Sequence, residues 1–535
     1  MYTDALTVPE LLVRRIEQDS SSPAVITADQ TLTYAELDAR SRTIAAWLIN
    51  EAGVAKGARI GLLMENGVGW VSIAVAIMRI GAVLVPLSTF LQHQELIDQL
   101  AVASVQHLVV TPEFNGRDYL ADVSAIVDPA GAKGSCRGLV RDPQAPSLRS
   151  VWSAAELMAI APAVAAFPSQ CEMIDALGKQ VFPGDDMVIM FTSGSSGRAK
   201  GCIHTHGSAI RGVSTSLADR GVRRDDRLYL PMPLFWTGGF GMGLMTALIT
   251  GCALITEAIS EPSRTLELLS RSKVTLFRGW PDQAVRLAQH PQFAAADLGS
   301  LRPGSLDALM PSQFRAKAPS SRAALLGMTE TFGPYCCFPL NEDMPTDKWG
   351  SAGRVQPGIS VKIVDPETGA ELPHGQSGAI TVRGPNLMRG ICGRETAEVF
   401  GRDGFYVTGD LGRVDEDGFL FYEGRGDDMF KAKGATVYPS EVERALRDIP
   451  GVIRAYVTDV TAQDTGEKEV GAAVVAGSAD MFDASGLGAA LRSRLSAFKR
   501  PTRWLIYSSI EDVPMLSSGK VDKRALRDAL SRARR

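Results

Sequence analysis

The chain has 535 residues, of which 45% are hydrophobic and 22% charged, a mixture typical of globular proteins. One hydrophobic core rarely serves more than roughly 250–300 residues, so we expect at least two domains. The formal net charge of −4 argues against a nucleic-acid-binding protein, because such proteins carry a strongly basic surface.

The seven cysteines follow neither a metal-binding nor a disulfide spacing. Cys336 and Cys337 are adjacent and the others are scattered, which favours reduced thiols and a cytoplasmic location. No basic segment followed by an apolar run opens the sequence, so we expect no signal peptide. Residues 231–256 are uncharged, but prolines and glycines interrupt them, which favours a loop, a buried helix and a buried strand over a membrane span.

The first half of the chain alternates helix and strand patterns. Thr33 and Glu36 are spaced as a capping box, which predicts a helix start. Short apolar runs at residues 60–64 and 82–85 are typical of buried strands, and the apolar segment 71–78 between them is typical of a helix. Strands that alternate with helices predict a largely parallel sheet with helices on both faces.

The sequence pattern changes in the second half of the chain. Short apolar runs at residues 361–364 and 379–382, between turns rich in glycine and proline, predict a small β subdomain. Ser440 and Glu443 predict a second capping box. Strands and a further helix follow, which gives a compact α+β unit of about 110 residues, enough for an independent domain.

A loop rich in glycine, serine and threonine follows the apolar run 187–191. Its sequence, residues 192–201, is Thr-Ser-Gly-Ser-Ser-Gly-Arg-Ala-Lys-Gly. Glycines let backbone N–H groups turn toward an anion, while hydroxyls and Lys200 supply further donors to phosphate oxygens. The spacing differs from that of a Walker A loop. Phosphate binding is one interpretation, and a flexible linker is the other.

Five motifs, in this order, resemble those of the adenylate-forming superfamily, which includes acyl-CoA synthetases, nonribosomal adenylation domains and firefly luciferase. They are the loop 192–201, the sequence Gly-Met-Thr-Glu at 327–330, residues 406–410, Gly424-Arg425 with Gly434 and 439–443, and residues 514–520. The resemblance covers essentially the whole chain. It implies an α/β fold with a large N-terminal domain of helix-covered sheets and a small β subdomain at 1–424, then a small mobile α+β C-terminal domain at 425–535.

The resemblance implies roles for residues of these motifs. Lys520, Thr329 and Glu330 are implied as catalytic, with Glu330 also holding Mg²⁺, a cation that prefers oxygen ligands. Asp427 is implied as the hinge about which the C-terminal domain rotates. Residues implied to bind ATP or coenzyme A (CoA) are Thr192, Ser193, Gly194, Ser195, Ser196, Gly197, Lys200, Leu326, Gly327, Asp410, Arg425, Lys433 and Gly434.

Each implied role has a physical reason and an alternative. Adenylation needs stabilisation of the charge that develops as a carboxylate attacks the α-phosphate, which Lys520 could supply, although its loop is also typical of an exposed turn. Asp410 could accept hydrogen bonds from both ribose hydroxyls, but a turn aspartate is equally consistent with its sequence. Thr329 would donate to the α-phosphate, and Glu330 could otherwise simply start a helix.

Three positions depart from the family pattern. Leu326 stands where the family usually has an aromatic residue against adenine. The segment 305–308 matches the family's adenine loop poorly, so the adenine contacts stay open. Trp236 stands where the family often has histidine or another aromatic at the gate of the acyl pocket.

The uncharged segment around Trp236 also bears on the substrate. It lacks the aspartate that pairs with the ammonium group in amino-acid-activating relatives, and an unpaired buried ammonium is costly. We therefore expect a hydrophobic, bulky carboxylic acid, with space left by glycines that include Gly241 and Gly243. Met242 and Phe240 could equally be core residues. The residues expected to line the pocket are Phe235, Trp236, Gly238, Gly239, Phe240, Met328 and Phe332.

His204 and His206 form a His-x-His pair, but two residues are too few for a metal site, so we expect structural or substrate-proximal roles. Overall the resemblance implies an acyl-CoA synthetase that forms acyl-AMP and then a CoA thioester. Two alternatives are a ligase that loads an acyl carrier protein and, more remotely, an inactive nucleotide-binding regulator. A luciferase-like oxygenase is a remote third, and a homodimer is left open.

Overall fold

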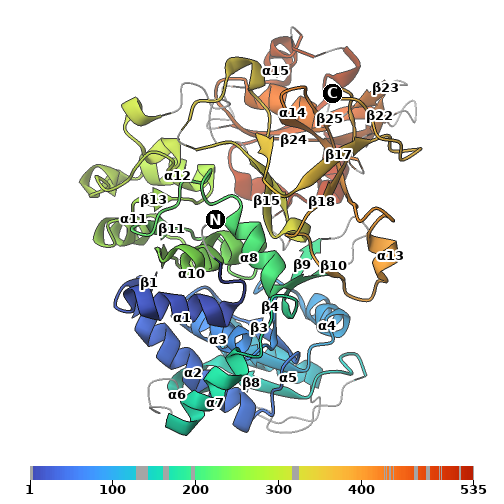
Figure 1. Cartoon of the computed structure of the whole chain (residues 1–535). Helices are drawn as coiled ribbons and strands as arrows, with labels where there is room; N and C mark the ends of the chain where they lie inside the picture. The colour runs from blue at the N-terminus through green and yellow to red at the C-terminus, as the bar shows by residue number, and fades with distance from the viewer. Residues whose placement is uncertain are drawn as a thin grey trace. The chain divides into compact units, whose positions relative to one another are not determined.

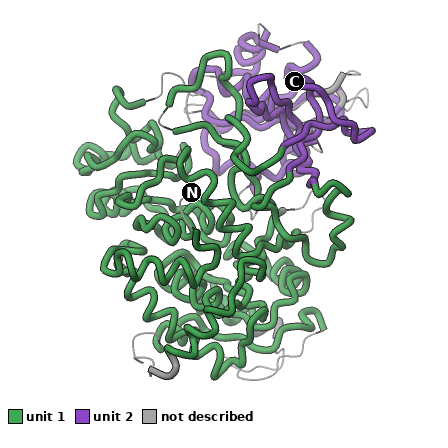
Figure 2. Tube along the Cα trace, viewed as in Figure 1, with its two compact units in different colours: residues 1–360, 383–404 green, residues 361–382, 405–535 purple. Residues whose placement is uncertain are grey.

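The structure is a computed structural model of the chain. It describes residues 4–533 except 128–142, 161–167, 194–198, 316–324, 341, 427, 429, 433–434, 438, 463–467, 477–481, 493, 496 and 517–519. The chain forms two compact units, which Figure 2 distinguishes by colour. Unit 1 comprises residues 1–360 and 383–404, and unit 2 comprises residues 361–382 and 405–535.

Unit 1 is built on two sheets that are mainly parallel, as the alternating pattern predicts. In the larger sheet β10 is antiparallel to both of its neighbours, β19 and β9, and the other described pairings are parallel. Its strands, in spatial order, are β19 (Gly390–Ile391), β10 (Ala199–Thr205), β9 (Asp186–Ser193), β4 (Val83–Leu87), β3 (Arg59–Leu63), β5 (His107–Val110) and β8 (Ser150–Ser153).

The second sheet of unit 1 has four parallel strands and one antiparallel edge strand. In spatial order these are β13 (Leu276–Phe277), β11 (Arg227–Tyr229), β12 (Ala253–Ile255), β1 (Pro23–Ile26) and β2 (Thr31–Thr33). Smaller sheets complete the unit, namely β14 (Leu325–Met328), β15 (Gly333–Cys337) and β16 (Arg354–Val355), and the pair β6 (Glu113–Phe114) and β7 (Arg117–Asp118).

Helices cover these sheets and bury their apolar faces in three hydrophobic clusters, one of which is much the largest. Figure 1 shows α1, α2 and α3 grouped beside strands of the larger sheet. The helices of unit 1 are α1 (Val8–Asp19), α2 (Tyr34–Asn50), α3 (Val68–Arg79), α4 (His93–Val102), α5 (Tyr119–Val127), α6 (Ala154–Ile160), α7 (Pro168–Gly178), α8 (His206–Ser214), α9 (Thr237–Gly239), α10 (Thr246–Thr250), α11 (Pro262–Arg271), α12 (Pro281–Gln289) and α13 (Thr396–Val399).

The capping box predicted before the second helix is confirmed. Thr33 Oγ1 accepts the Glu36 N–H at 3.2 Å, and the Glu36 carboxylate accepts the Thr33 N–H at 2.8 Å. These bonds satisfy N–H groups that the first turn of a helix leaves without partners. They fix the start of α2 directly after β2.

The uncharged segment 231–256 forms a loop, helical turns and a buried strand, as predicted. Between α9 and α10 lies a π-helix, Phe240–Met245, which the sequence pattern did not predict. Such wide turns occur mostly at functional sites, because they displace side chains from the regular helical positions. Of the helices that the structure describes, none combines the length and apolarity needed to span a bilayer.

Unit 2 contains the predicted β subdomain and the predicted α+β unit. Its sheets are formed by β17 (Ser360–Val364), β18 (Gly378–Arg383), β20 (Tyr406–Val414) and β21 (Leu420–Arg425), by β22 (Phe430–Ala432) and β23 (Ala435–Val437), and by β24 (Val452–Thr461), β25 (Lys468–Ala476) and β26 (Arg503–Tyr507). Its helices are α14 (Pro439–Arg447), α15 (Ala484–Ala490) and α16 (Lys523–Arg532).

The predicted capping box at Ser440 and Glu443 is wrong. Ser440 lies inside the first turn of α14, and its hydroxyl donates to the carbonyl oxygen of Glu423. The Glu443 carboxylate accepts the N–H of Val457 at 3.0 Å. Both side chains therefore join α14 to neighbouring strands of unit 2, an outcome that depends on tertiary contacts and not on local spacing.

Candidate active site

The predicted phosphate loop connects two paired strands. Lys200 in β10 lies directly opposite Thr192 in β9, and Ala199 lies opposite Ser193. Thr192 and Lys200 are both half-buried. The remaining predicted loop residues, Gly194 to Gly197, lie outside the described residues. The register pairs a threonine with a lysine near the ends of the two strands, and both side chains can donate to an anion.

A tight turn follows β14 and carries the predicted catalytic pair. A Cβ atom at Gly327 would lie 2.6 Å from the Gly333 carbonyl oxygen, so only glycine fits there. Thr331 Oγ1 donates to the same oxygen at 2.7 Å and closes the turn. Thr329 is half-buried and Glu330 is 7% exposed. The turn thus presents a hydroxyl and a carboxylate from a rigid backbone.

Three segments that are far apart in the sequence meet at Thr329. His204 Nε2, from β10, lies 2.8 Å from the Thr329 carbonyl oxygen. Thr237 Oγ1, at the start of α9, lies 3.4 Å from Thr329 Oγ1. The contacts join the strand after the phosphate loop, the Gly-x-Thr-Glu turn and the expected acid-binding segment within unit 1.

The two histidines have separate environments. His204 donates to Thr329, whereas His206 Nδ1 accepts the N–H of Val8 at 3.2 Å. Burial lowers the pKa of His204 to about 4 and the pKa of His206 to about 3, so both rings are neutral at neutral pH. Within the described part of the chain, no three His, Cys, Asp or Glu side chains are grouped as metal ligands.

Aromatic side chains gather where the expected acid segment begins. The rings of Phe235 and Trp236 are 5.7 Å apart, and Phe90 lies 5.8 Å from Phe235 and 6.1 Å from Trp236. Phe90, which follows β4, was not predicted, because nothing in its local sequence connects it with residue 236. Since Trp236 is half-buried and Phe90 is 46% exposed, these two rings can contact a ligand, whereas Phe235 is buried.

The prediction that Phe240 and Phe332 line the pocket is corrected. Both side chains are 0% exposed. The Phe240 ring contacts Trp70 and Phe332, and the Phe332 ring contacts His204. These rings form a continuous aromatic column in the core of unit 1. Met328 and Met242 are half-buried.

The prediction that the glycines leave space is also corrected. A Cβ atom at Gly239 would lie 2.1 Å from the Pro233 carbonyl oxygen and 2.5 Å from that of Met232. At Gly243 it would lie 3.0 Å from the Leu230 side chain, and at Gly241 3.5 Å from Phe332. The glycines therefore allow close packing of backbone and core. Gly238 differs, because only the Met232 sulfur, at 3.0 Å, lies near its Cβ position.

In unit 2, Asp410 and Arg425 face each other across β20 and β21. Arg425 Nη1 donates to Asp410 Oδ1 at 3.2 Å and to the Thr408 carbonyl oxygen at 3.2 Å. The intervening Gly409 has φ +78°, and a Cβ atom there would lie 2.9 Å from the Arg425 guanidinium. The predicted ribose-binding aspartate is thus held by the predicted arginine, although the two were assigned from separate motifs.

The remaining predicted residues are less fully described. Lys520 is exposed in unit 2, on a loop closed by the Leu516 N–H bond to its carbonyl oxygen at 2.7 Å. Leu326 is half-buried in β14, opposite Cys336. The predicted hinge, Asp427, and the predicted CoA-loop residues, Lys433 and Gly434, lie outside the described residues.

Glu330 fits the implied magnesium ion. Mg²⁺ is commonly bound by one or two carboxylates and by the phosphates of its nucleotide, while keeping several waters. A single carboxylate at the edge of a rigid turn, with Thr329 beside it, matches this ligand set. A cage of several carboxylates would be expected for other cations, and the described residues offer none.

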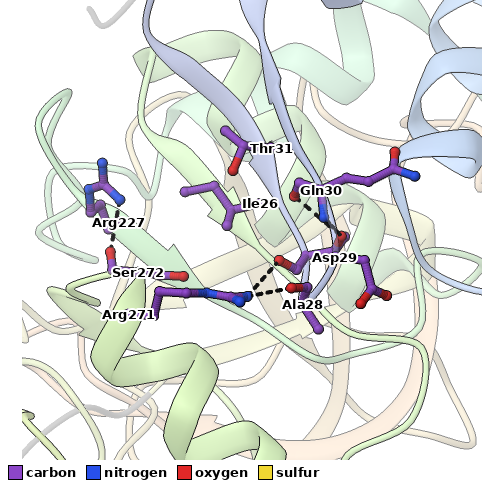
Figure 3. Close-up of a pocket in the computed structure, with 9 residues that line it drawn as sticks. Ile26, Ala28, Asp29, Gln30, Thr31, Arg227, Arg271 and Ser272 are labelled. Atoms are coloured by element: carbon purple, nitrogen blue, oxygen red, sulfur yellow. Dashed lines mark hydrogen bonds between the residues drawn. The ribbon is translucent and has the colours of Figure 1, made fainter.

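A hollow of about 260 Å³ in unit 1 is unrelated to these residues (Figure 3). It is lined by the turn after β1, with Arg227 and Arg271 opposite. Arg271 Nη2 donates to the carbonyl oxygens of Thr27 at 3.3 Å and Ala28 at 2.5 Å. The hollow contains none of the predicted site residues, and Arg271 serves to hold the turn.

Residues 12–392 match the family described as AMP-binding enzyme, and the chain belongs to this family. It is 32% identical to a feruloyl-CoA synthase from Amycolatopsis sp, over 96% of this chain and 97% of the relative. It is 30% identical to 3-[(3aS,4S,7aS)-7a-methyl-1,5-dioxo-octahydro-1H-inden-4-yl]propanoyl:CoA ligase from Rhodococcus jostii (strain RHA1), over 99% of each chain.

Among solved structures, ATP bound MatB from Rhodopseudomonas palustris has a TM-score of 0.78 and 28% identity, over 98% of this chain and 99% of MatB. These findings confirm the predicted membership of the adenylate-forming superfamily and the predicted α/β fold. The domain boundary at residues 424 and 425 stays a prediction, because it falls inside unit 2, at the end of β21.

The contacts around two neighbouring glycines predict different losses of stability on substitution by alanine. Gly239→Ala should destabilise the protein by at least about 1–3 kcal/mol, since its methyl group would displace backbone carbonyls. Gly238→Ala should cost less than about 1 kcal/mol, because only a flexible methionine side chain must move. Urea unfolding of both variants checks this, and equal effects would contradict the packing described.

The buried neutral histidines predict sensitivity to acid. Burial lowers the pKa of His204 from 6.5 to about 4. Below pH 6.5 this imidazole is therefore protonated in the unfolded chain, whereas in the folded chain it stays neutral until the pH approaches 4. Between pH 6.5 and 4, stability should therefore fall by on the order of 3 kcal/mol through this residue. His204→Asn should reduce the pH dependence measured by urea unfolding, whereas His374→Asn, at an exposed position, should not.

Proposed function

We propose that the chain is an acyl-CoA synthetase that activates a carboxylic acid with ATP, forms acyl-AMP, and transfers the acyl group to CoA with release of AMP. The observation that carries this proposal is the convergence on Thr329 of the phosphate-loop hairpin and the acid segment, through His204 and Thr237. An adenylating enzyme must bring a carboxylate to the α-phosphate, and this junction joins the parts that would bind each.

Adenylation needs no general base, because the substrate carboxylate is already a nucleophile. We assign charge stabilisation at the α-phosphate to Lys520 and hydrogen bonding to Thr329. Magnesium at Glu330 would add positive charge at the phosphate oxygens. Thr192 and Lys200 would bind the outer phosphates together with the loop between them. Asp410, already positioned by Arg425, would accept hydrogen bonds from the ribose hydroxyls.

ATP as the nucleotide is supported by the likeness to ATP bound MatB. CoA as the acceptor is supported by the two relatives named as a CoA synthase and a CoA ligase. A carrier protein remains the second candidate acceptor. The six described cysteines are thiols and not disulfides, which supports a cytoplasmic location, where thiols stay reduced.

The proposal also includes two positions of the C-terminal domain, residues 425–535. In one position Lys520 would face the α-phosphate. In the other, rotation about Asp427 would bring the loop at Lys433 and Gly434 to the acyl-adenylate. A turn of a few residues at the end of a strand can absorb such a change, and Asp427 follows β21 closely.

The overall reaction is tested by ATP–pyrophosphate exchange over a panel of carboxylic acids. Exchange should require Mg²⁺ and an acid, and addition of CoA should then release AMP. Glu330→Gln should reduce exchange by about 10²-fold or more, because it removes the charged ligand. Release of ADP and phosphate would contradict adenylation, and exchange without any effect of CoA would favour the carrier-protein alternative.

The two half-reactions should separate by mutation. Lys520→Ala should slow acyl-AMP formation by about 10²–10³-fold, the usual loss for one transition-state contact, and leave thioester formation from synthetic acyl-AMP nearly intact. Gly434→Leu should slow thioester formation and leave acyl-AMP formation nearly intact, because the leucine side chain would block the approach of the CoA thiol. Lys179→Ala, at an exposed lysine of unit 1, is the control. Equal loss of both steps in folded Lys520→Ala would rule out two alternating positions.

A further inference from the structure

An arginine lies at the sheet edge where the expected acid segment begins. Strands β11 and β13 are parallel neighbours, so their carboxyl ends share one edge. The segment with Trp236 leaves that edge after Tyr229. Arg278 is the first residue beyond β13, and its N–H donates to the Tyr229 carbonyl oxygen at 2.9 Å. In open parallel sheets, ligands bind in the crevice beyond this edge.

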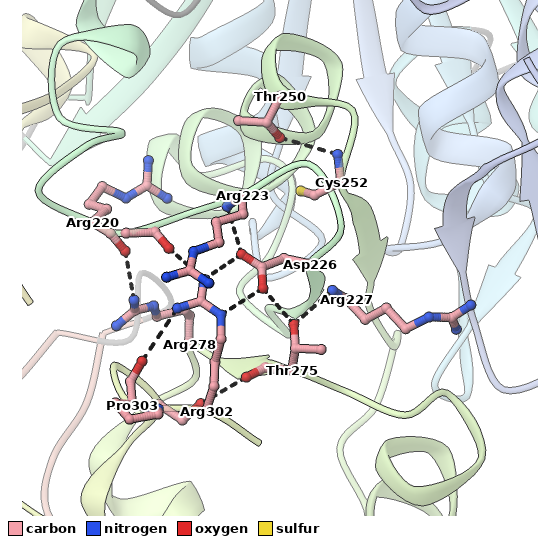
Figure 4. Close-up of polar contacts among 12 residues, drawn as sticks. Arg220, Arg223, Asp226, Arg227, Thr250, Cys252, Thr275, Arg278, Arg302 and Pro303 are labelled. Atoms are coloured by element: carbon pink, nitrogen blue, oxygen red, sulfur yellow. Dashed lines mark hydrogen bonds and ion pairs between the residues drawn. The ribbon is translucent and has the colours of Figure 1, made fainter. Parts of the chain in front are cut away.

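The Arg278 side chain meets a second arginine (Figure 4). Arg278 Nη2 donates to the carbonyl oxygen of Arg220 at 2.9 Å. The Arg220 guanidinium in turn donates to Thr246 Oγ1 at 3.2 Å and to the Met242 carbonyl oxygen at 3.1 Å. Arg220 thereby lies against the π-helix of the expected acid segment. A Cβ atom at Gly304, beside the expected adenine loop, would lie 3.2 Å from Arg278 Nη2.

Among the described residues neither guanidinium forms an ion pair, although the charge of Asp226 still raises the pKa of Arg278. Asp226 is the nearby carboxylate, but Arg302 holds it, with Nε 2.8 Å from Oδ1. No carboxylate of the described residues lies within 4.0 Å of Arg220 or Arg278. Burial raises the pKa of the neighbouring thiol of Cys337 to about 11, so it is protonated at neutral pH and supplies no negative charge.

Both arginines are nevertheless charged. Desolvation by the surrounding protein lowers the pKa of Arg220 to about 10 and that of Arg278 to about 9, both well above neutral pH. Arg220 is only 5% exposed, while Arg278 is half-buried. The residue Arg278 thus keeps some exposed surface. Among the described residues, one of its five N–H donors has a protein acceptor, the Arg220 carbonyl oxygen.

Two adjacent buried positive charges that form no ion pair among the described residues are costly to the fold unless a ligand completes them. Carbonyl and hydroxyl oxygens of the protein accept hydrogen bonds from some of the guanidinium N–H groups, but they do not neutralise the positive charge of these groups. Guanidinium groups match carboxylates in shape, through paired N–H···O bonds. The location between the acid segment and the expected adenine loop makes a part of the acid substrate the natural ligand.

We propose that Arg278, supported by Arg220, binds a second carboxylate of the acid substrate, remote from the carboxylate that is activated. The inference rests on the proposed function. It specifies an acid with an apolar body and an anionic far end, that is, a dicarboxylic acid. Arg278 is then a specificity-determining residue that contacts substrate, and Arg220 is a positioning residue.

Matched substrates test the proposal. ATP–pyrophosphate exchange is measured with succinate, adipate, sebacate and terephthalate, with the monomethyl ester of each, and with monocarboxylic acids of similar length. The best diacid should exceed its own monoester by about 10²-fold or more in kcat/KM, since a site with buried polar groups strongly rejects an analogue that leaves them unpaired. Arg278→Met should bring this ratio close to one and leave the KM for ATP unchanged.

Two further variants distinguish binding from a structural role. Arg278→Lys keeps the charge and should retain part of the preference, whereas Arg264→Met, at an exposed helix position, should retain all of it. Thermal unfolding verifies that each variant is folded. Exchange that favours monocarboxylic acids or monoesters, with the ratio unmoved in folded Arg278→Met, would overturn this inference and leave the proposed function standing. Absence of exchange with every acid would overturn the proposed function itself.

Discussion

The close backbone contact at the turn after β14 is the constraint on which the site in unit 1 depends. Gly327 must approach Gly333 without a side chain between them, and Phe332 adopts φ +52° to complete the turn. A Cβ atom at Gly212 of α8 would lie 2.8 Å from the Thr331 carbonyl oxygen, so the helix also presses on the turn. Because the backbone of the turn is fixed from two sides, Thr329 has few accessible backbone conformations.

This rigidity extends toward the acid segment through apolar packing. The rings of Trp70, Phe240, Phe332 and His204 contact one another in sequence through the core. Close-packed protein interiors transmit displacements, because one ring cannot move unless the neighbouring ring also moves. The turn and the π-helix are therefore held at a fixed separation. A nucleotide phosphate at Thr329 and an acid beside Trp236 would be positioned by the same column.

Local patterns predicted the parts of the molecule that local interactions determine. The Thr33–Glu36 capping box and the buried parallel strands follow from spacing alone, and the motif order predicted the family. Ser440 and Glu443 have the same spacing, yet bond to other strands of unit 2. The glycines after Trp236 were interpreted as open space, because the carbonyl oxygens that approach Gly239 become visible only in three dimensions.

The expectation of a hydrophobic, bulky acid rests on the composition of one segment. Residues 231–256 contain no charge, so their composition predicts an apolar pocket. Arg220 precedes this segment and Arg278 follows it, 58 residues apart, and a hydrogen bond joins them beside the paired strands β11 and β13. The proposed site would place two guanidinium groups beside this uncharged segment, which Arg220 contacts at Thr246 and Met242. A ligand that satisfies both must be amphipathic, since an entirely apolar acid would leave the charges desolvated and unpaired.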